Sequence, residues 1–137
     1  MILVPLVVQT VFVFAQAPAD RRSVWDGVYT DAQAKRGRDA YQYSCATCHG
    51  PDLEGDSGRD VPALYGEDFV REWSRNSLKE LSDLIRNGMP KDSPGSLSAQ
   101  TYTAIVAFLL QANEFPVGVQ ELPVDPAALA RIRMDKP

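Results

Sequence analysis

Apolar side chains recur every three or four residues in the stretch 78–88, which is the spacing of one helix face. The residues that form this stripe are Leu78, Leu81, Leu84 and Ile85. Ser77 and Glu80 form a capping box at its start, and Gly88 is a typical stop at its end. These signals predict a helix that buries the stripe against the rest of the protein.

Two longer helices are predicted on either side of this one. The first begins at Thr30 or Asp31 and groups small and aromatic residues on one face: Ala34, Gly37, Ala40 and Tyr41. The second begins at Ser98 and has a broader apolar face: Tyr102, Ile105, Val106, Phe108 and Leu109. A glycine inside a helix costs about 1 kcal/mol relative to alanine, so Gly37 indicates a close crossing with another helix.

Shorter elements and loops fill the rest of the chain. The sequence predicts two short helices, one over residues 67–73 and one that begins at Asp125 and Pro126. Residues 50–69 and 89–98 contain glycine, proline and aspartate at the density of loops. No stretch alternates apolar and polar residues over the length of a strand. The pattern therefore predicts an all-α fold with long loops.

Length and charge narrow the class of protein. A chain of 137 residues is expected to form one domain, and its net charge of -4 argues against nucleic acid as a partner. Residues 2–15 are almost entirely apolar, which suits a signal peptide better than a spanning helix of about 20 residues. No lysine or arginine precedes them, so retention as a membrane anchor is the alternative, and export is expected in both cases.

The predicted division of the chain follows from these signals. Residues 1–17 are a signal peptide or N-terminal anchor, and residues 18–29 are a linker. The main domain covers residues 30–118, and residues 119–137 form a C-terminal tail that contains a short helix.

Both cysteines and the single histidine lie within five residues, in the sequence CATCHG. On one helical turn, Cys45 and Cys48 lie on the same side as His49. The two thiols can form thioether bonds with the two vinyl groups of haem, and the imidazole of the next residue can bind the iron. This spacing is the attachment motif for c-type haem, and it predicts one covalent haem c in an exported protein.

Three other uses of these residues stay open at this point. A thiol-redox C-x-x-C motif usually lies in a βαβ unit, which this pattern does not predict. A closed zinc site needs four ligands, so these three residues would require a carboxylate or a partner. An exported chain can also join Cys45 to Cys48 in a disulfide, with His49 taking no part.

A haem iron bound by one histidine has a second axial position, and the chain has no second histidine. Methionine is the usual remaining ligand in an electron carrier, and it raises the reduction potential. Met89 lies in the loop sequence NGMPKD, whereas Met1 lies in the leader and Met134 lies among charges in the tail. Met89 is therefore the predicted second ligand, and Met134 is predicted to be a surface or packing residue.

Residues 30–118 resemble the class I c-type cytochromes. The motifs that carry the resemblance are, in chain order, GRDAYQYSCATCHG, VPALYGEDFVREW, LSDLIRNGMP and YTAIVAFLL. The resemblance implies a cytochrome c fold, with three to five helices wrapped around one covalent haem and an extended C-terminal tail. It also implies that Gly37 and Tyr41 cross the last long helix near Phe108.

The same resemblance assigns further residues to the haem. The carbonyl of Pro62 would accept a hydrogen bond from His49 and fix the tautomer of the imidazole. The residues that would line the haem pocket are Leu64, Tyr65, Phe69 and Leu81. Trp73 would lie near the propionate edge or donate to a propionate, and Arg59 would be a further propionate partner.

The predicted function is that of an electron carrier, not an enzyme: a periplasmic cytochrome moves single electrons through a His/Met-ligated haem. The implied partners are redox proteins such as a dehydrogenase, a respiratory complex or a terminal oxidase. The C-terminal sequence is similar to that of small bacterial cytochromes found beside quinoprotein dehydrogenases. One alternative is a sensor or peroxidase-like enzyme with an open or labile sixth position on the iron. Another is an electron-transfer subunit of a dehydrogenase complex, tethered to the membrane by residues 2–15.

Overall fold

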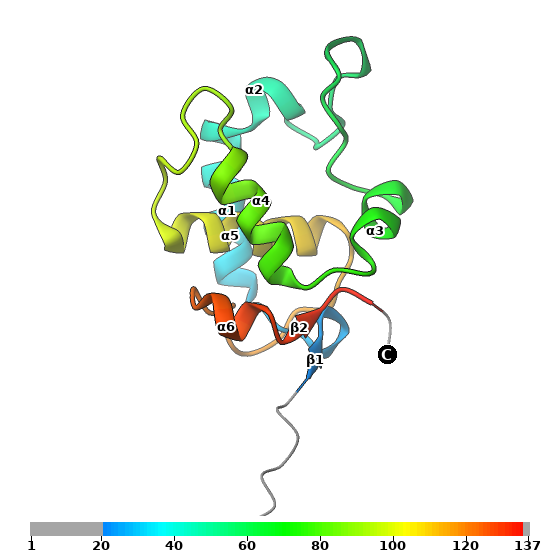
Figure 1. Ribbon diagram of the computed structural model, residues 1–137, viewed down its shortest axis with the longest axis vertical. Helices are drawn as coiled ribbons and strands as arrows, with labels where there is room; N and C mark the ends of the chain where they lie inside the picture. The colour runs from blue at the N-terminus through cyan, green and yellow to red at the C-terminus, as the bar shows by residue number, and fades with distance from the viewer. Residues whose placement is uncertain (1–20, 136–137) are drawn as a thin grey trace, which may run out of the picture.

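The computed structural model describes residues 21–135, and these form a helical fold with one very small sheet (Figure 1). The elements in chain order are β1 (Arg22–Ser23), η1 (Val24–Asp26), α1 (Asp31–Ser44), α2 (Ala46–His49), η2 (Ser57–Arg59), α3 (Glu67–Trp73), α4 (Leu78–Gly88), α5 (Ala99–Ala112), α6 (Pro126–Leu129) and β2 (Ile132–Arg133). The predicted signal peptide or anchor at residues 1–17 lies outside the described residues. No helix between residues 21 and 135 is long and apolar enough to span a bilayer.

Helices α1, α4, α5 and α6 begin where side-chain oxygens accept hydrogen bonds from free backbone amides. Thr30 accepts from the amide of Gln33 at the start of α1, and Ser98 caps α5 in the same way. Ser77 and Glu80 form the predicted capping box at the start of α4. Each cap satisfies an amide that has no partner inside the helix. The helix starts predicted from the sequence are thus confirmed.

Helices α1 and α5 cross in close contact at Gly37. A Cβ atom at this position would lie 1.8 Å from the carbonyl oxygen of Ala104, well inside van der Waals contact. One turn further along α1, the ring of Tyr41 packs against the ring of Phe108, with 5.3 Å between the centroids. The crossing implied by the resemblance is confirmed, and the missing side chain of Gly37 is what permits it.

Helix α4 packs its apolar stripe against α5 and the tail. Leu78, Leu81 and Ile85 are buried, but Leu84 is 53% exposed. A rotation of about 100° per residue places position 84 at the edge of the stripe, away from the other three. The predicted helix is therefore correct, and its buried face is narrower than the sequence indicated.

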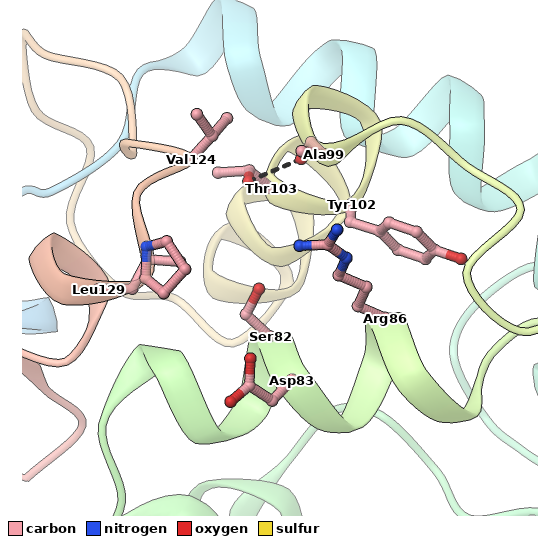
Figure 2. Close-up of a pocket in the computed structure, with 9 residues that line it drawn as sticks. Ser82, Asp83, Arg86, Ala99, Tyr102, Thr103, Val124 and Leu129 are labelled. Atoms are coloured by element: carbon pink, nitrogen blue, oxygen red, sulfur yellow. Dashed lines mark hydrogen bonds between the residues drawn. The ribbon is translucent and has the colours of Figure 1, made fainter.

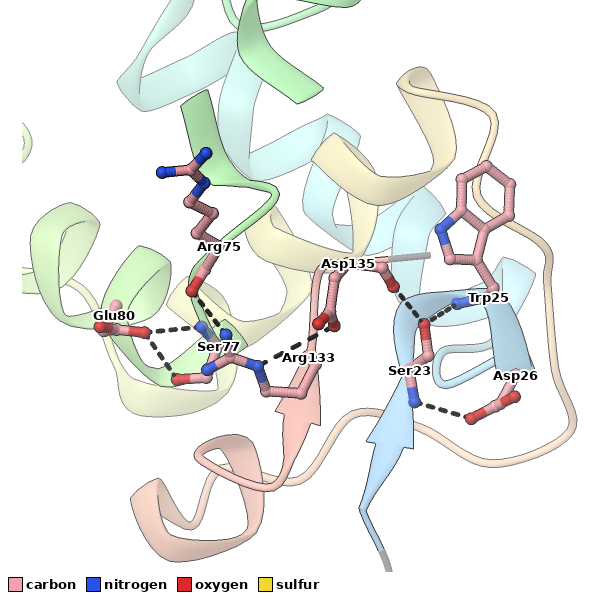
Figure 3. Close-up of polar contacts among 8 residues, drawn as sticks. All are labelled: Ser23, Trp25, Asp26, Arg75, Ser77, Glu80, Arg133 and Asp135. Atoms are coloured by element: carbon pink, nitrogen blue, oxygen red, sulfur yellow. Dashed lines mark hydrogen bonds and ion pairs between the residues drawn. The ribbon is translucent and has the colours of Figure 1, made fainter. Parts of the chain in front are cut away.

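The two ends of the described chain pack together, which differs from the predicted linker over residues 18–29. Strand β1 pairs in parallel with β2, with Arg22 opposite Ile132. Ser23 Oγ donates to the carbonyl of Asp135, and the guanidinium of Arg133 donates to the carbonyl of Arg75 (Figure 3). Apolar residues from both flanks enter the core: Val24, Val28, Tyr29, Leu122, Leu129, Ile132 and Met134. Strands of two residues show no alternation, so the sequence pattern does not reveal them.

Gln33 fixes the C-terminal tail to α1. Its side chain is 3% exposed, and its amide makes two hydrogen bonds with the backbone of Leu122. Nε2 donates to the carbonyl at 3.1 Å, and Oε1 accepts from the amide at 2.8 Å. A buried amide is stable only when its polar atoms are paired in this way. The tail is therefore an integral part of the fold and continues its core.

We predict that Gly37→Ala lowers the free energy of unfolding by about 1–3 kcal/mol or more, because the added methyl group forces the two helices apart. Gly88→Ala is the matched control, since a Cβ at this helical glycine meets nothing within 4 Å. The free energy of unfolding of the control is expected to rise by about 0.5–1 kcal/mol. Urea unfolding of both variants measures the difference, and equal midpoints would contradict the close crossing.

Candidate haem-binding site

The CATCHG motif forms one turn of helix directly after α1. The amide of Cys45 donates to the carbonyl of Tyr41 at 2.8 Å, so α1 continues up to the motif. The amides of Cys48 and His49 then both donate to the carbonyl of Cys45, at 3.1 and 3.0 Å. The predicted single turn is confirmed, with Cys45 at its start and Cys48 and His49 at its end.

The two thiols differ in environment and are not joined by a disulfide. Cys45 is half-buried, and burial, with a smaller contribution from Cys48, raises the pKa of its thiol to about 11. Cys48 is exposed. A thiol-redox site needs a thiolate, which a lowered pKa favours. The raised pKa of Cys45 therefore argues against the thiol-redox alternative.

The imidazole of His49 is oriented by the loop that follows the motif. His49 is 8% exposed, and its Nδ1 lies 3.1 Å from the carbonyl oxygen of Pro62. A carbonyl can only accept, so Nδ1 must carry the hydrogen. The neutral ring then has its lone pair on Nε2, which is the form that binds a metal. The contact that the resemblance implied between these two residues is present.

The backbone around His49 is held by hydrogen bonds from Tyr41, in α1, and from Gly55, in the loop that follows the motif. The hydroxyl of Tyr41 donates to the carbonyl of Gly50 at 2.6 Å, and burial raises the pKa of this phenol well above its usual value. The amide of Gly55 donates to the carbonyl of His49 at 2.8 Å. Because Tyr41 also packs against Phe108, the position of the motif depends on the α1–α5 crossing.

Asn113, at the end of α5, anchors the loop that contains Pro62. Its Nδ2 donates to the carbonyl of Leu64 at 3.0 Å, and its Oδ1 accepts from the amide of Gly66 at 2.9 Å. Sequence reasoning did not single out this residue. An asparagine after a long apolar helix is an ordinary helix end, and no local signal connects it to a loop 49 positions earlier.

The residues that the resemblance assigns to the pocket are found in different environments. Phe69 and Leu81 are buried and Leu64 is half-buried, whereas Tyr65 is 48% exposed. Trp73 is half-buried, with its ring centroid 6.4 Å from that of Phe69.

Arg59 lies in the exposed part of the loop and forms an ion pair with Asp56 at 2.6 Å. This pairing lowers the pKa of Asp56. The roles of Arg59 and Trp73 at the propionates stay predictions.

The two methionines of the described chain have different surroundings. Met89 is half-buried at the end of α4 and packs at the edge of the core. Its amide donates to the carbonyl of Ile85 at 2.9 Å, and its carbonyl accepts from the hydroxyl of Tyr102 at 2.8 Å. Met134 is 2% exposed, so of the two predicted roles, surface or packing, the structure shows packing.

A shallow pocket lies elsewhere, between α4, α5 and α6 (Figure 2). Its lining includes Ser82, Arg86, Thr103 and Leu129. Neither the cysteines nor His49 and Met89 belong to this lining. The pocket is therefore separate from the motif.

The chemistry of the donors fits a haem better than a bare metal ion. Within residues 21–135, no group of three histidine, cysteine or carboxylate side chains is arranged to hold a metal ion. Two neighbouring thiols and an imidazole with its lone pair on Nε2 are instead the groups that covalent haem attachment requires.

Comparison with known proteins agrees with this donor set. Residues 32–109 match the family model described as "Cytochrome C oxidase, cbb3-type, subunit III". This match covers more than half of the chain and includes the entire motif. The chain belongs to this family of c-type cytochromes. As a class I c-type cytochrome, it carries one covalent haem c, whose attachment motif is provided by Cys45 and Cys48.

Two individual proteins are similar to this cytochrome. Cytochrome c-551 of Bacillus subtilis (strain 168) is 35% identical over 65 residues, which are 47% of this chain and 54% of the relative. The match thus spans about half the length of that relative. A solved structure titled "Crystal Structure of the Sulfane Dehydrogenase SoxCD from Paracoccus pantotrophus" aligns with a TM-score of 0.52. It covers 90% of this chain and 68% of the other chain at 20% identity, so it shows the shared fold alone.

We predict that Cys45→Ser with Cys48→Ser abolishes the covalent link, because no thiol remains to form a thioether bond. Haem absorbance should stay with the denatured wild-type polypeptide after acid extraction and disappear from the double variant. Thr47→Ala, in the same turn, is the matched control and should keep the haem. Retention of haem by the denatured double variant would contradict the attachment.

Proposed function

We propose that this protein is a periplasmic monohaem cytochrome that carries single electrons between redox partners, and that His49 and Met89 would bind the haem iron. The observation that carries the proposal is the hydrogen bond between His49 Nδ1 and Pro62, which prepares Nε2 for a metal. The apolar sequence at residues 2–15 supports export, as does the chemistry of c-type haem, which is attached outside the cytoplasm.

The role of Met89 as the second iron ligand is supported by the hydrogen bonds that hold its backbone. Hydrogen bonds fix both its amide and its carbonyl, while its side chain sits at the edge of the core. Met134, in contrast, is enclosed by the flanking segments. A thioether ligand stabilises the reduced iron and raises the reduction potential.

The bound haem supplies a reversible one-electron change between Fe(III) and Fe(II). The protein's part is to hold the group still, to exclude water and to bring one edge to the surface. Cys48 and Pro62 are exposed, so the side of the motif that they form is the proposed exit for the electron.

The charge beside this exit indicates the kind of partner. Residues 51–72 contain seven acidic and two basic side chains, a net charge of -5, whereas the entire chain has -4. The excess negative charge thus lies in the loop and helix that follow the motif. We propose that the redox partner presents a basic surface to this segment.

A second candidate is the same electron transfer inside a larger assembly. The structural neighbour belongs to a sulfane dehydrogenase, which favours a role as the electron-transfer subunit of a dehydrogenase complex. Size-exclusion chromatography of a native extract, followed by haem absorbance, separates the two candidates. Elution as a small protein supports the free carrier, and elution with a large dehydrogenase supports the subunit.

We predict that Met89→Leu lowers the reduction potential, removes the weak far-red band of a sulfur–iron bond, and allows cyanide or carbon monoxide to bind the iron. The change removes the thioether and nearly conserves volume. Met134→Leu is the matched control and should change none of these properties. Potentiometry and optical titration measure them. If the wild-type protein bound cyanide as readily as Met89→Leu, Met89 would not be the iron ligand. That result would favour the sensor or peroxidase-like alternative.

We also predict that electron transfer to a basic redox protein slows by about tenfold or more as salt rises from about 10 mM to about 200 mM. Glu72→Lys should weaken this dependence, because it removes negative charge from the docking segment. Asp39→Lys makes the same charge change on α1, outside the segment, and should have a smaller effect. Stopped-flow kinetics measure the salt dependence of the electron-transfer rate for both variants. Equal changes in Glu72→Lys and Asp39→Lys would contradict docking at residues 51–72.

A further inference from the structure

One buried hydroxyl, that of Tyr102, contacts both ends of the loop between α4 and α5. It donates to the carbonyl of Met89 at 2.8 Å, and it accepts from the amide of Leu97 at 3.4 Å. Tyr102 itself is 2% exposed. Figure 2 shows its phenol ring pointing away from Thr103 and Leu129 and toward this loop.

The loop has few other means of staying in place. Residues 91–96 are exposed, and their backbone hydrogen bonds, from Ser93 to Pro90 and from Ser96 to Ser93, are internal to the loop. Exposed loops with few packed side chains are the least stable parts of a fold. The backbone of Met89 is therefore held by α4, through its amide, and by Tyr102, through its carbonyl, while its side chain packs at the edge of the core.

We propose that Tyr102 is the positioning residue for Met89, and that its hydroxyl keeps the thioether on the haem iron. This inference rests on the proposed function, because it requires Met89 to be the ligand. Without the hydroxyl, the carbonyl of Met89 loses its partner and the start of the loop is released from α5. The sulfur then leaves the iron more often, and an external ligand competes more effectively.

Tyr29 provides a closely matched control. It is also a buried tyrosine, at 0% exposure, and its hydroxyl also donates to a backbone carbonyl, that of Phe115, at 2.6 Å. It precedes α1 and contacts the segment after α5, and neither end of the Met89 loop takes part in its hydrogen bond. Removing the Tyr29 hydroxyl costs one buried hydrogen bond. Removing the Tyr102 hydroxyl costs the comparable bond to the carbonyl of Met89 and the longer, weaker one from the amide of Leu97. Only the Tyr102 hydroxyl reaches Met89.

The test is a cyanide titration of the ferric holoprotein, with the wild type and the variants Tyr102→Phe, Tyr29→Phe and Met89→Leu. Tyr102→Phe should bind cyanide about 2- to 12-fold more tightly than the wild type, which is the equilibrium equivalent of one hydrogen bond. Its far-red band should weaken. Tyr29→Phe should lose a similar amount of stability in urea and keep the cyanide affinity and the band of the wild type.

The outcomes separate this inference from the one on which it rests. If Met89→Leu opens the iron but Tyr102→Phe behaves like Tyr29→Phe, Met89 is the ligand and Tyr102 does not position it. If Met89→Leu leaves the spectrum and the cyanide affinity of the wild type unchanged, Met89 is not the ligand, and the role of Tyr102 is refuted with it.

Discussion

The close approach of α1 and α5 at Gly37 is the constraint on which the haem site depends. The backbone of Ala104 occupies the space where a side chain at position 37 would lie, so the two helices can approach this closely only because position 37 is glycine. Tyr41 extends from α1 and Tyr102 from α5. Their hydroxyls bind the carbonyls of Gly50 and Met89. The same crossing thus sets the backbone position on both sides of the proposed iron site.

Hydrogen bonds to backbone carbonyl groups hold the proposed ligands in place. None of these bonds uses the atoms proposed to bind the iron, which are Nε2 of His49 and the sulfur of Met89. The carbonyls of Gly50 and Met89 accept from the two phenols, and the carbonyl of Pro62 accepts from the ring of His49. Second-layer contacts of this kind orient a ligand and tune its basicity. Ligands that are already in place before and after electron transfer need little rearrangement, which suits a carrier that cycles between two charge states.

Features with a local chemical signal could be predicted from the sequence, whereas features made by distant segments could be predicted only where the family resemblance supplied them, as for Tyr41 and Phe108. The capping box at Ser77 and the one-turn spacing of CATCHG depend on neighbours within four residues, and both are present as expected. The contacts of Gln33 with the tail and of Asn113 with the loop join positions far apart in the sequence. Strands of two residues have no periodicity at all. The packing of residues 21–29 and of the tail into the core therefore appears only in the folded structure.

The pairing of β1 with β2 has a consequence for any longer polypeptide that contains this fold. It brings residue 22 beside residue 132, so both ends of the described chain leave from one pole of the molecule. Helix α2, with the haem motif, lies at the opposite end in Figure 1. Anything joined before β1 or after β2, whether another domain or a surface to which the protein is attached, would lie at the end opposite α2 and would leave the proposed site of electron exchange accessible to a partner. The fold thus places its two chain ends and its haem motif at opposite ends of the molecule.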